Sequence, residues 1–551
     1  MFQTLPRAFV GAKHGHGHGH GPTRYTSRLN FSSTINSCNN RPKHSLSPAI
    51  LPSIHTSRTT INTTTTQLSA SHPSMSTRQH EDDDVESLPE PRFLLPQLGG
   101  ADTEDVERYQ RGGFHPVHLG DVYDGRYRVV HKLGAGGFST IWLARDETEH
   151  RWVALKIVVA DYSTSVSTKS QLSCHAASQC ASDTVFHFVV EHRHFTLNGP
   201  NGRHLCLVLP VLGPSASDLS KGIYSRITPW ISRRASYQVT RALADLHAQG
   251  LCHGDVTTAN ILFGLLDIDR YRESDIYRLF GAPETAPLET ESGETPGPEA
   301  PSYIVKSLDF LSSEESVISK DVRLIDFDQS FLISLPPQQM LGTPVEFLAP
   351  EVAVGLKASP ASDIWALGCS IFRIRSGEGP FSGYEVTSPV DLMRMIIRTL
   401  GELPGSWEDI LFDYDGQPTN EPTKGGPLET WESKRPIKDL IYKIWDQPEN
   451  NVVKTGRVRL EHRVWREDEN KPYPRCLSDT VWKPTATKID NIYLYGYNDE
   501  TDELLEAMPK ISENEAALLY DLLSKIFVYD AQKRPSAREM LSHPWFHIDD
   551  L

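Results

Sequence analysis

The sequence predicts an α+β protein with two lobes, a small lobe rich in β-strands followed by a larger helical lobe. Short runs of alternating apolar residues, typical of strands, occupy the stretch from about residue 126 to 209. From about residue 228 onward, apolar residues recur three and four positions apart, as they do on one face of a helix. Hydrophobic residues make up 38% of the 551, which is enough for a sizeable core. A β-rich front followed by a helical back is typical of two packed lobes.

The N-terminal stretch differs in composition from the rest of the chain. Residues 1–80 contain eight Lys and Arg and no Asp or Glu, whereas the whole chain has a net charge of −16, so the remainder carries −24. We predict that residues 1–90 form a disordered, basic leader rich in Ser, Thr and His. The leader has the composition of a mitochondrial transit peptide, but an untargeted tail, or translation that starts at Met75, would explain it too. Its repeat of His14, His16, His18 and His20 is either a weak metal chelator or low-complexity sequence.

The overall composition excludes several classes of protein. With 55 basic and 71 acidic residues, the chain is not expected to bind nucleic acid directly. No run of about 18 apolar residues occurs, so we expect no membrane-spanning helix. The seven cysteines include no CxxC pair, which indicates reduced thiols and no zinc site. The acidity would suit basic peptide substrates, although solubility is the simpler explanation.

The elements follow in order along the folded part. We predict strands at residues 126–130, 141–144, 152–159 and 205–209. A helix is predicted at 231–246. Polar stretches at 264–320 and about 444–510 interrupt the helical half, and we interpret both as insertions, the first as a solvated loop.

A glycine-rich turn and a strand lysine come first among the chemical motifs. Residues 133–141 read Leu-Gly-Ala-Gly-Gly-Phe-Ser-Thr-Ile between two predicted strands. Backbone amides can approach phosphates closely there, although a tight hairpin would have the same sequence. No Gly-Lys-Ser/Thr follows, and the next element is a strand, so this is neither a Walker A nor a Rossmann motif. Lys156 on the following strand needs a polar partner, either a nucleotide phosphate or solvent.

Two further segments supply carboxylates and an amide. Residues 252–262 contain Asp255 and, five positions on, Asn260, while Asp326 follows an apolar strand. Phosphoryl transfer needs a group that orients the acceptor hydroxyl, ligands for a metal that bridges phosphates, and a cation on the phosphate oxygens. Each residue alone could equally be a solvated side chain or a helix cap. Their order and spacing together favour phosphoryl transfer.

In this order the motifs resemble the signature set of eukaryotic protein kinases. The set comprises the glycine loop, the strand lysine, HxDxxxxN at 253–260 and Asp-Phe-Asp at 326–328, with Asp328 standing where the set has Gly. It continues with Ala-Pro-Glu at 349–351, Asp-Ile-Trp-Ala-Leu-Gly at 363–368 and Arg534. Residues 109–117, 132–143 and 202–213 are similar to SR-protein kinases of fungal type.

The resemblance covers residues 127–546 and implies a bilobal protein kinase fold. Its N-lobe would span about 127–213 and its C-lobe about 214–546, with the insert at 264–320 and a family-specific extension at 91–126. It implies a serine/threonine kinase that phosphorylates serines next to arginines in splicing factors. It also implies a monomer of the cytoplasm and nucleus, with the mitochondrion as the alternative that the leader suggests.

The resemblance also assigns roles to residues. Asp255 would accept or orient the hydroxyl proton of the substrate, and Asn260 and Asp326 would hold Mg²⁺. Glu351 would pair with Arg534 to brace the C-lobe. The residues that would contact ATP are Leu133, Gly134, Gly136, Ile141, Ala154, Lys156 and Leu212. Lys156 would also be a catalytic residue.

Besides Asp328, the chain departs from the kinase pattern at three positions that bear on activity. No Glu occurs between Lys156 and Glu191, and Gln171 stands near the place where the family has the Glu that pairs with the strand lysine. Thr257 replaces a lysine of the catalytic loop, which removes a cation from the transferring phosphoryl group. Gly254 replaces the arginine that grips a phosphorylated activation loop, so activity is expected not to depend on that phosphorylation. Gln171 and Thr257 leave a nucleotide-binding pseudokinase or scaffold as the alternative to an active kinase. A non-kinase metabolic ATPase is a third possibility.

Overall fold

The computed structural model describes most of the chain from residue 91 onward. The described ranges are 91–94, 98, 103–166, 187–220, 225–310, 317–383, 386–423, 425–428, 434–446 and 508–550, with residue 506 and four short strands between 464 and 495. The predicted leader, its histidine repeat, Met75 and Gln171 lie outside these residues, as does most of the predicted insertion at 444–510. Within the described ranges, no helix is both long and apolar enough to cross a membrane.

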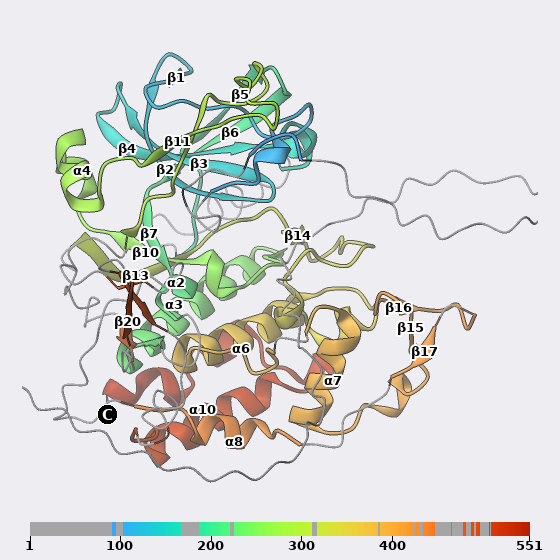
Figure 1. The fold of residues 1–551 in the computed structure, drawn as a ribbon. Coiled ribbons are helices and arrows are strands. Elements are labelled where there is room, and N and C mark those ends of the chain that lie inside the picture. The colour runs from blue at the N-terminus through green and yellow to red at the C-terminus, as the bar shows by residue number, and fades with distance from the viewer. Residues whose placement is uncertain are drawn as a thin grey trace, which may run out of the picture. The chain divides into compact units, whose positions relative to one another are not determined.

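A six-stranded antiparallel sheet forms the smaller lobe (Figure 1). Its spatial order is β1-β2-β3-β4-β6-β5. The strands are β1 (Val122–Tyr123), β2 (Tyr127–Gly136), β3 (Ser139–Asp146), β4 (Arg151–Val158), β5 (Arg193–Gly199) and β6 (Gly202–Pro210). All four strands that the sequence predicts are therefore confirmed, and β1 and β5 were missed. β1 has two residues, too few for an alternating pattern, and β5 offers only Phe195 and Leu197 as apolar residues among polar ones.

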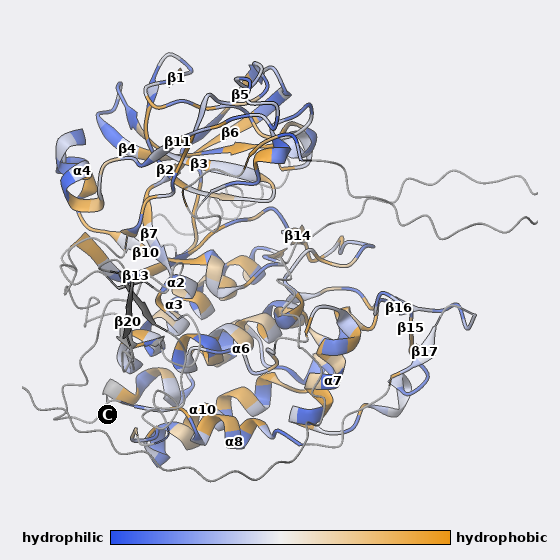
Figure 2. Ribbon diagram, viewed as in Figure 1, coloured by the Kyte–Doolittle hydropathy of each residue, from blue (hydrophilic) through white to orange (hydrophobic). Residues whose placement is uncertain are grey.

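Helices dominate the larger lobe, and its core forms around the long helix α3 (Pro229–Ala248), which contains the helix predicted at 231–246. Pro229 at the first helical position suits the start of α3, since the missing N–H has no partner there in any helix. The other helices are α2 (Ala216–Leu219), α5 (Pro350–Ala353), α6 (Pro360–Ser376), α7 (Pro389–Leu400), α8 (Ile437–Tyr442), α10 (Glu513–Ile526) and α11 (Ala537–Met540). Figure 2 shows hydrophobic residues along the sheet and along α6, α7 and α10.

Short strands complete the larger lobe and carry the loops of interest. One three-stranded sheet has the order β13-β10-β7, and β14 pairs with β9. Their bounds are β7 (Leu212–Ser215), β9 (Leu251–Cys252), β10 (Ile261–Leu265), β13 (Ile318–Leu324) and β14 (Phe331–Leu332). The remaining short strands are β8 (Ser225–Ile227), β15 (Leu411–Phe412), β16 (Pro418–Thr419), β17 (Gly426–Pro427), β18 (Val464–Trp465), β19 (Ser478–Thr480), β20 (Ala486–Ile489) and β21 (Ile492–Tyr495).

The segment predicted to be a solvated loop at 264–320 is instead built into the smaller lobe. It contains α4 (Glu273–Phe280) and a hairpin of β11 (Thr285–Pro287) and β12 (Tyr303–Val305). Ile304 packs in a buried cluster with Val106 and Tyr109 of the N-terminal extension. Val305 joins the cluster on the outer face of the sheet, which explains why β4 is buried on both faces. The expectation was wrong because the few apolar residues of this polar segment find their partners far away in the sequence.

The same segment is fastened to the sheet of the smaller lobe by polar contacts. Glu273 of α4 pairs with Arg128 of β2 at 2.9 Å, and Asp269 accepts a hydrogen bond from the Trp152 backbone of β4 at 2.6 Å. The N-terminal extension adds a fully buried ion pair between Glu104 and Lys132 of β2. The ladder places Lys132 on the outer face of the sheet, opposite Lys156, and Arg128 on the face that carries Lys156, so these contacts fasten both faces.

Candidate active site

The glycine-rich turn joins β2 to β3 and is the first part of the candidate site along the chain. Gly134 pairs with Ile141 in the ladder between the two strands, and Ile141 in turn pairs with Lys156 of β4. A Cβ added at Gly134 or Gly136 would meet no atom within 4 Å, so the turn presents bare backbone to open space. This is the arrangement that lets backbone amides approach a phosphate.

The other residues that the resemblance assigns to ATP lie near this turn or at the link between the lobes. Leu133 precedes the first glycine on β2, and Ala154 lies two positions before Lys156 on β4, hence on the same face of the sheet. Leu212 begins β7, the strand that follows β6 and leads into the larger lobe, and pairs with Gly264 of β10. The fold thus places Leu133, Ala154 and Lys156 in the sheet and Leu212 at the connection between the lobes.

Lys156 of β4 is paired with two carboxylates of the segment after β13. Its Nζ donates to Asp326 Oδ1 and to Asp328 Oδ2, both at 2.9 Å. Burial alone would lower the pKa of Lys156, but the two negative charges outweigh it and raise this pKa above its usual value. The lysine is therefore a fixed cation, and only 7% of its side chain is exposed.

Asp255 and Asn260 lie together in the loop between β9 and β10. Asn260 Nδ2 donates to Asp255 Oδ2 at 2.7 Å and to the Asp255 carbonyl oxygen at 3.0 Å. Asp255 Oδ1 is buried and accepts no hydrogen bond from the described residues. Burial raises the pKa of Asp255 to about 7, and the nearby negative charge of Asp326 contributes. One carboxylate oxygen is thus oriented by Asn260 while the other is left for a ligand.

Asp363 of α6 supports this loop from below, a role that the sequence motifs do not specify. Its Oδ2 accepts hydrogen bonds from His247 Nε2 at 2.9 Å and from the His253 backbone at 2.8 Å. Its Oδ1 accepts the Gly254 backbone N–H at 2.8 Å. Burial alone would raise the pKa of Asp363, but these donors lower it below the usual value. The loop is therefore anchored to a buried carboxylate immediately before Asp255.

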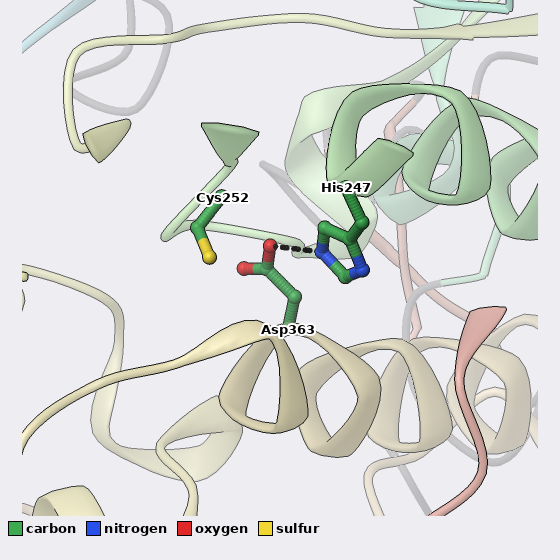
Figure 3. A group of neighbouring side chains, drawn as sticks. All are labelled: His247, Cys252 and Asp363. Atoms are coloured by element: carbon green, nitrogen blue, oxygen red, sulfur yellow. Dashed lines mark hydrogen bonds and ion pairs between the residues drawn. The ribbon is translucent and has the colours of Figure 1, made fainter. Parts of the chain in front are cut away.

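His247, Asp363 and Cys252 also have the proximity of a metal site, with ligand atoms within 4.8 Å of one another (Figure 3). Their hydrogen bonds argue against a metal there. Both oxygens of Asp363 already accept hydrogen bonds from the protein. Burial raises the pKa of the Cys252 thiol well above its usual value, whereas a metal ligand must be a thiolate. The cluster is a structural support for the catalytic loop.

The structure gives a reason for the departure at Gly254. This residue has φ of 79°, which favours glycine, and an added Cβ would overlap the carbonyl oxygen of Gln329. The Gly254 carbonyl oxygen accepts a hydrogen bond from Thr343 Oγ1 at 2.6 Å. Thr343 and Ser330 are both buried, so neither hydroxyl is presented to an external kinase.

The predicted brace of the larger lobe is present. Arg534 Nη1 and Nη2 donate to the two carboxylate oxygens of Glu351 at 2.8 and 2.7 Å. Both side chains are buried, and the bidentate geometry is the one that an arginine fork favours.

Together these residues fit a nucleotide with a divalent cation. Asp326 and Asn260 supply the oxygen ligands that hard cations prefer, and Lys156 supplies a cation for phosphate oxygens. The Asn260 carbonyl oxygen accepts the backbone N–H of Ile325 at 2.9 Å, which places the two metal-ligand candidates on adjoining segments. The buried, unpartnered Oδ1 of Asp255 is suited to accept a proton from a hydroxyl.

Comparison with known proteins agrees with this geometry. The protein kinase domain model matches residues 127–268 and 305–546, and its gap coincides with α4 and the β11–β12 hairpin. The chain is 30% identical to "Serine/threonine-protein kinase SRPK" of Physarum polycephalum over 56% of its own length and 75% of that protein. It is 35% identical to "SRSF protein kinase 3" of Sus scrofa over 37% of its length and 39% of that protein. It is 31% identical to "Protein kinase dsk1" of Schizosaccharomyces pombe over 40% of its length and 42% of that protein.

Proposed function

Because the chain belongs to the protein kinase family, and within it to the SRPK group of serine/threonine kinases, we propose that it transfers the γ-phosphate of ATP to serines of Arg/Ser-rich splicing factors. Protein kinases use ATP and a divalent metal, and Mg²⁺ is the ion that we assign here. The match spans three quarters of the Physarum relative but about two fifths of the pig and fission yeast ones.

The observation that carries the proposal is that four side chains, Lys156, Asp255, Asn260 and Asp326, lie on adjoining segments and pair with one another. Lys156 would hold the α- and β-phosphates, and Asn260 and Asp326 would ligate the metal. When bound, Mg²⁺ neutralises charge that develops on the phosphate oxygens. Asp255, oriented by Asn260, would accept the proton of the serine hydroxyl through Oδ1.

Two observations support a basic substrate. Residues 81–551 have a net charge of −24, which favours the approach of arginine-rich peptides. The pig relative is, by its name, a kinase of SRSF proteins. We extend that substrate class to this chain and, with it, the expectation of a monomer that acts in the cytoplasm and nucleus.

The buried positions of Thr343 and Ser330 support a kinase that needs no phosphate on its activation segment. Thr343 already donates its hydroxyl to the catalytic loop through the Gly254 carbonyl oxygen, and Ser330 Oγ donates to the Phe327 carbonyl oxygen at 2.7 Å. The segment is therefore held in place by hydrogen bonds of the unmodified side chains.

A pseudokinase is the second candidate, and Thr257 is the observation that favours it. Thr257 is buried beside the catalytic loop and supplies no positive charge, whereas kinases of this class usually have a lysine there. A chain of this kind would bind ATP with its metal and transfer little or no phosphate.

The two candidates are separated by a transfer assay with labelled ATP and an Arg-Ser repeat peptide. We expect transfer by the wild type and a loss of at least about 100-fold for Asp255→Asn, because the base is removed. Asp409→Asn, which neutralises an exposed aspartate, is the control and should retain full activity. ATP binding by the wild type without any transfer would support the pseudokinase, and transfer unaffected by Asp255→Asn would refute the assigned base.

A further inference from the structure

Lys156 has two carboxylate partners, and the second one has no place in the mechanism described so far. Its Nζ lies 2.9 Å from Asp326 Oδ1 and 2.9 Å from Asp328 Oδ2. Within the part of the chain that the structure describes, these are the carboxylates in ion-pair contact with Lys156. Asp328 is the more buried of the two, with 20% of its side chain exposed against 36% for Asp326.

The residue between them explains why both carboxylates face the lysine. Phe327 is buried, with its ring edge-on to Phe188 at 6.0 Å and near His253 at 4.9 Å. Because Phe327 anchors the segment to the core, Asp326 and Asp328 on either side of it are both held toward Lys156. The Asp328 backbone N–H also points to Asp326 Oδ1 at 3.3 Å.

Asp326 and Asp328 cannot both remain ion-pair partners of Lys156 once a metal is bound. Asp326 is the candidate metal ligand, and a divalent cation would draw its charge away from Lys156. A buried ammonium that loses its counter-ion is costly to keep in place. A lysine that must remain aimed at phosphates therefore needs a second carboxylate that the metal does not claim.

We propose that Asp328 is the positioning residue for Lys156, so that Asp326 remains available to the metal. The assignment rests on the proposed nucleotide site, but not on phosphate transfer itself. It gives Asp328 the opposing charge for a lysine whose following 34 residues contain no Glu. The competing role for Asp328 is that of an additional metal ligand, acting independently of Lys156.

A double-mutant cycle on ATP binding separates these roles. The dissociation constant for ATP at saturating Mg²⁺ is measured by titration calorimetry on the full chain. The variants are Asp328→Asn, Lys156→Met and the double variant, with Asp409→Asn as the control. We expect Asp328→Asn to weaken ATP binding by roughly 5- to 50-fold, and to cause no further loss when Lys156 is already methionine. A further loss of similar size in that background, or no loss in the single variant, would overturn the proposal.

Two more variants keep the test decisive if Asp328→Asn folds poorly. Asp328→Gly restores the residue of the kinase pattern, yet we expect it to bind ATP as weakly as Asp328→Asn does. Asp328→Glu keeps the charge and should recover part of the affinity. Affinity of Asp328→Gly equal to wild type would refute the proposal. Because binding is measured, a wild type that transfers no phosphate but shows the coupling would contradict the proposed function alone.

Discussion

Gly254 shows how one backbone position accounts for a missing side chain. Its φ of 79° and the closeness of the Gln329 carbonyl oxygen leave no room for a Cβ. The backbone at this position therefore has no room for the arginine of the kinase pattern. Thr343, which donates to the Gly254 carbonyl oxygen, links the catalytic loop to the activation segment without it.

Gly254→Ala is expected to destabilise the protein more than Gly250→Ala. Gly250 has a similar φ of 76°, but an added Cβ would meet no atom within 4 Å there. Gly250→Ala should cost about 1–2 kcal/mol for its left-handed backbone, and Gly254→Ala about 1–3 kcal/mol more for the overlap with Gln329. Urea unfolding of both variants measures the difference. Equal losses would show that the Gln329 carbonyl moves aside freely.

At the scale of elements, Asp363 ties α6 to the end of α3 and to the catalytic loop. The hydrogen bonds from His247 and from the backbone of His253 and Gly254 converge on this one carboxylate. Catalytic geometry at Asp255 therefore depends on a residue of a helix more than a hundred positions away in the sequence.

This support predicts a pH dependence of stability. The folded pKa of Asp363 is lowered, so its contribution to stability is present above the unfolded pKa of about 3.9 and is lost as the pH falls through the folded pKa. We expect Asp363→Asn to reduce the free energy of unfolding by at least about 2 kcal/mol near neutral pH, with the deficit shrinking below about pH 4. Urea unfolding of wild type and variant across pH checks this, with Asp409→Asn as a control that shows no such trend. A deficit that stays constant with pH would contradict it.

At the scale of the whole molecule, the segment from α4 to β12 connects the lobes a second time, beside β7. It leaves the larger lobe after β10, covers the outer face of the small-lobe sheet and returns to the larger lobe at β13. The stability of the small lobe is therefore partly supplied by residues that lie more than a hundred positions after its strands begin.

Ile304→Asp tests this dependence. A carboxylate at a site that is 1% exposed has no partner in the surrounding apolar cluster, so we expect a loss of at least about 3 kcal/mol. Hydrogen exchange should accelerate in β2, β3 and β4 before it does in α3. Thr285→Asp, at an exposed position of the same hairpin, should change neither quantity. Unaltered exchange in the sheet of Ile304→Asp would mean that the hairpin is dispensable.

Local pattern sufficed for much of the fold and for the four polar residues that the structure brings together. Alternation identified four strands of the sheet, and motif spacing located Lys156, Asp255, Asn260 and Asp326. The contacts that local pattern could not show join segments far apart in sequence. Asp328 contacts Lys156 across 172 positions of the sequence. The polar stretch around Ile304 has no apolar periodicity, so its sequence did not indicate that Ile304 packs in a buried cluster. Such contacts depend on tertiary packing, which short-range periodicity does not encode.

The hairpin of β11 and β12 also determines when the apolar cluster of the small lobe can be buried during synthesis. Val106, Tyr109 and Phe114 emerge from the ribosome long before Leu288 and Ile304, the partners that bury them. At the usual speed of translation this interval is roughly 10–40 s. Throughout it, the small lobe carries an uncovered apolar surface while most of the larger lobe has yet to be made. The nascent chain therefore depends on its own later half, or on chaperones, to protect the lobe that it makes first.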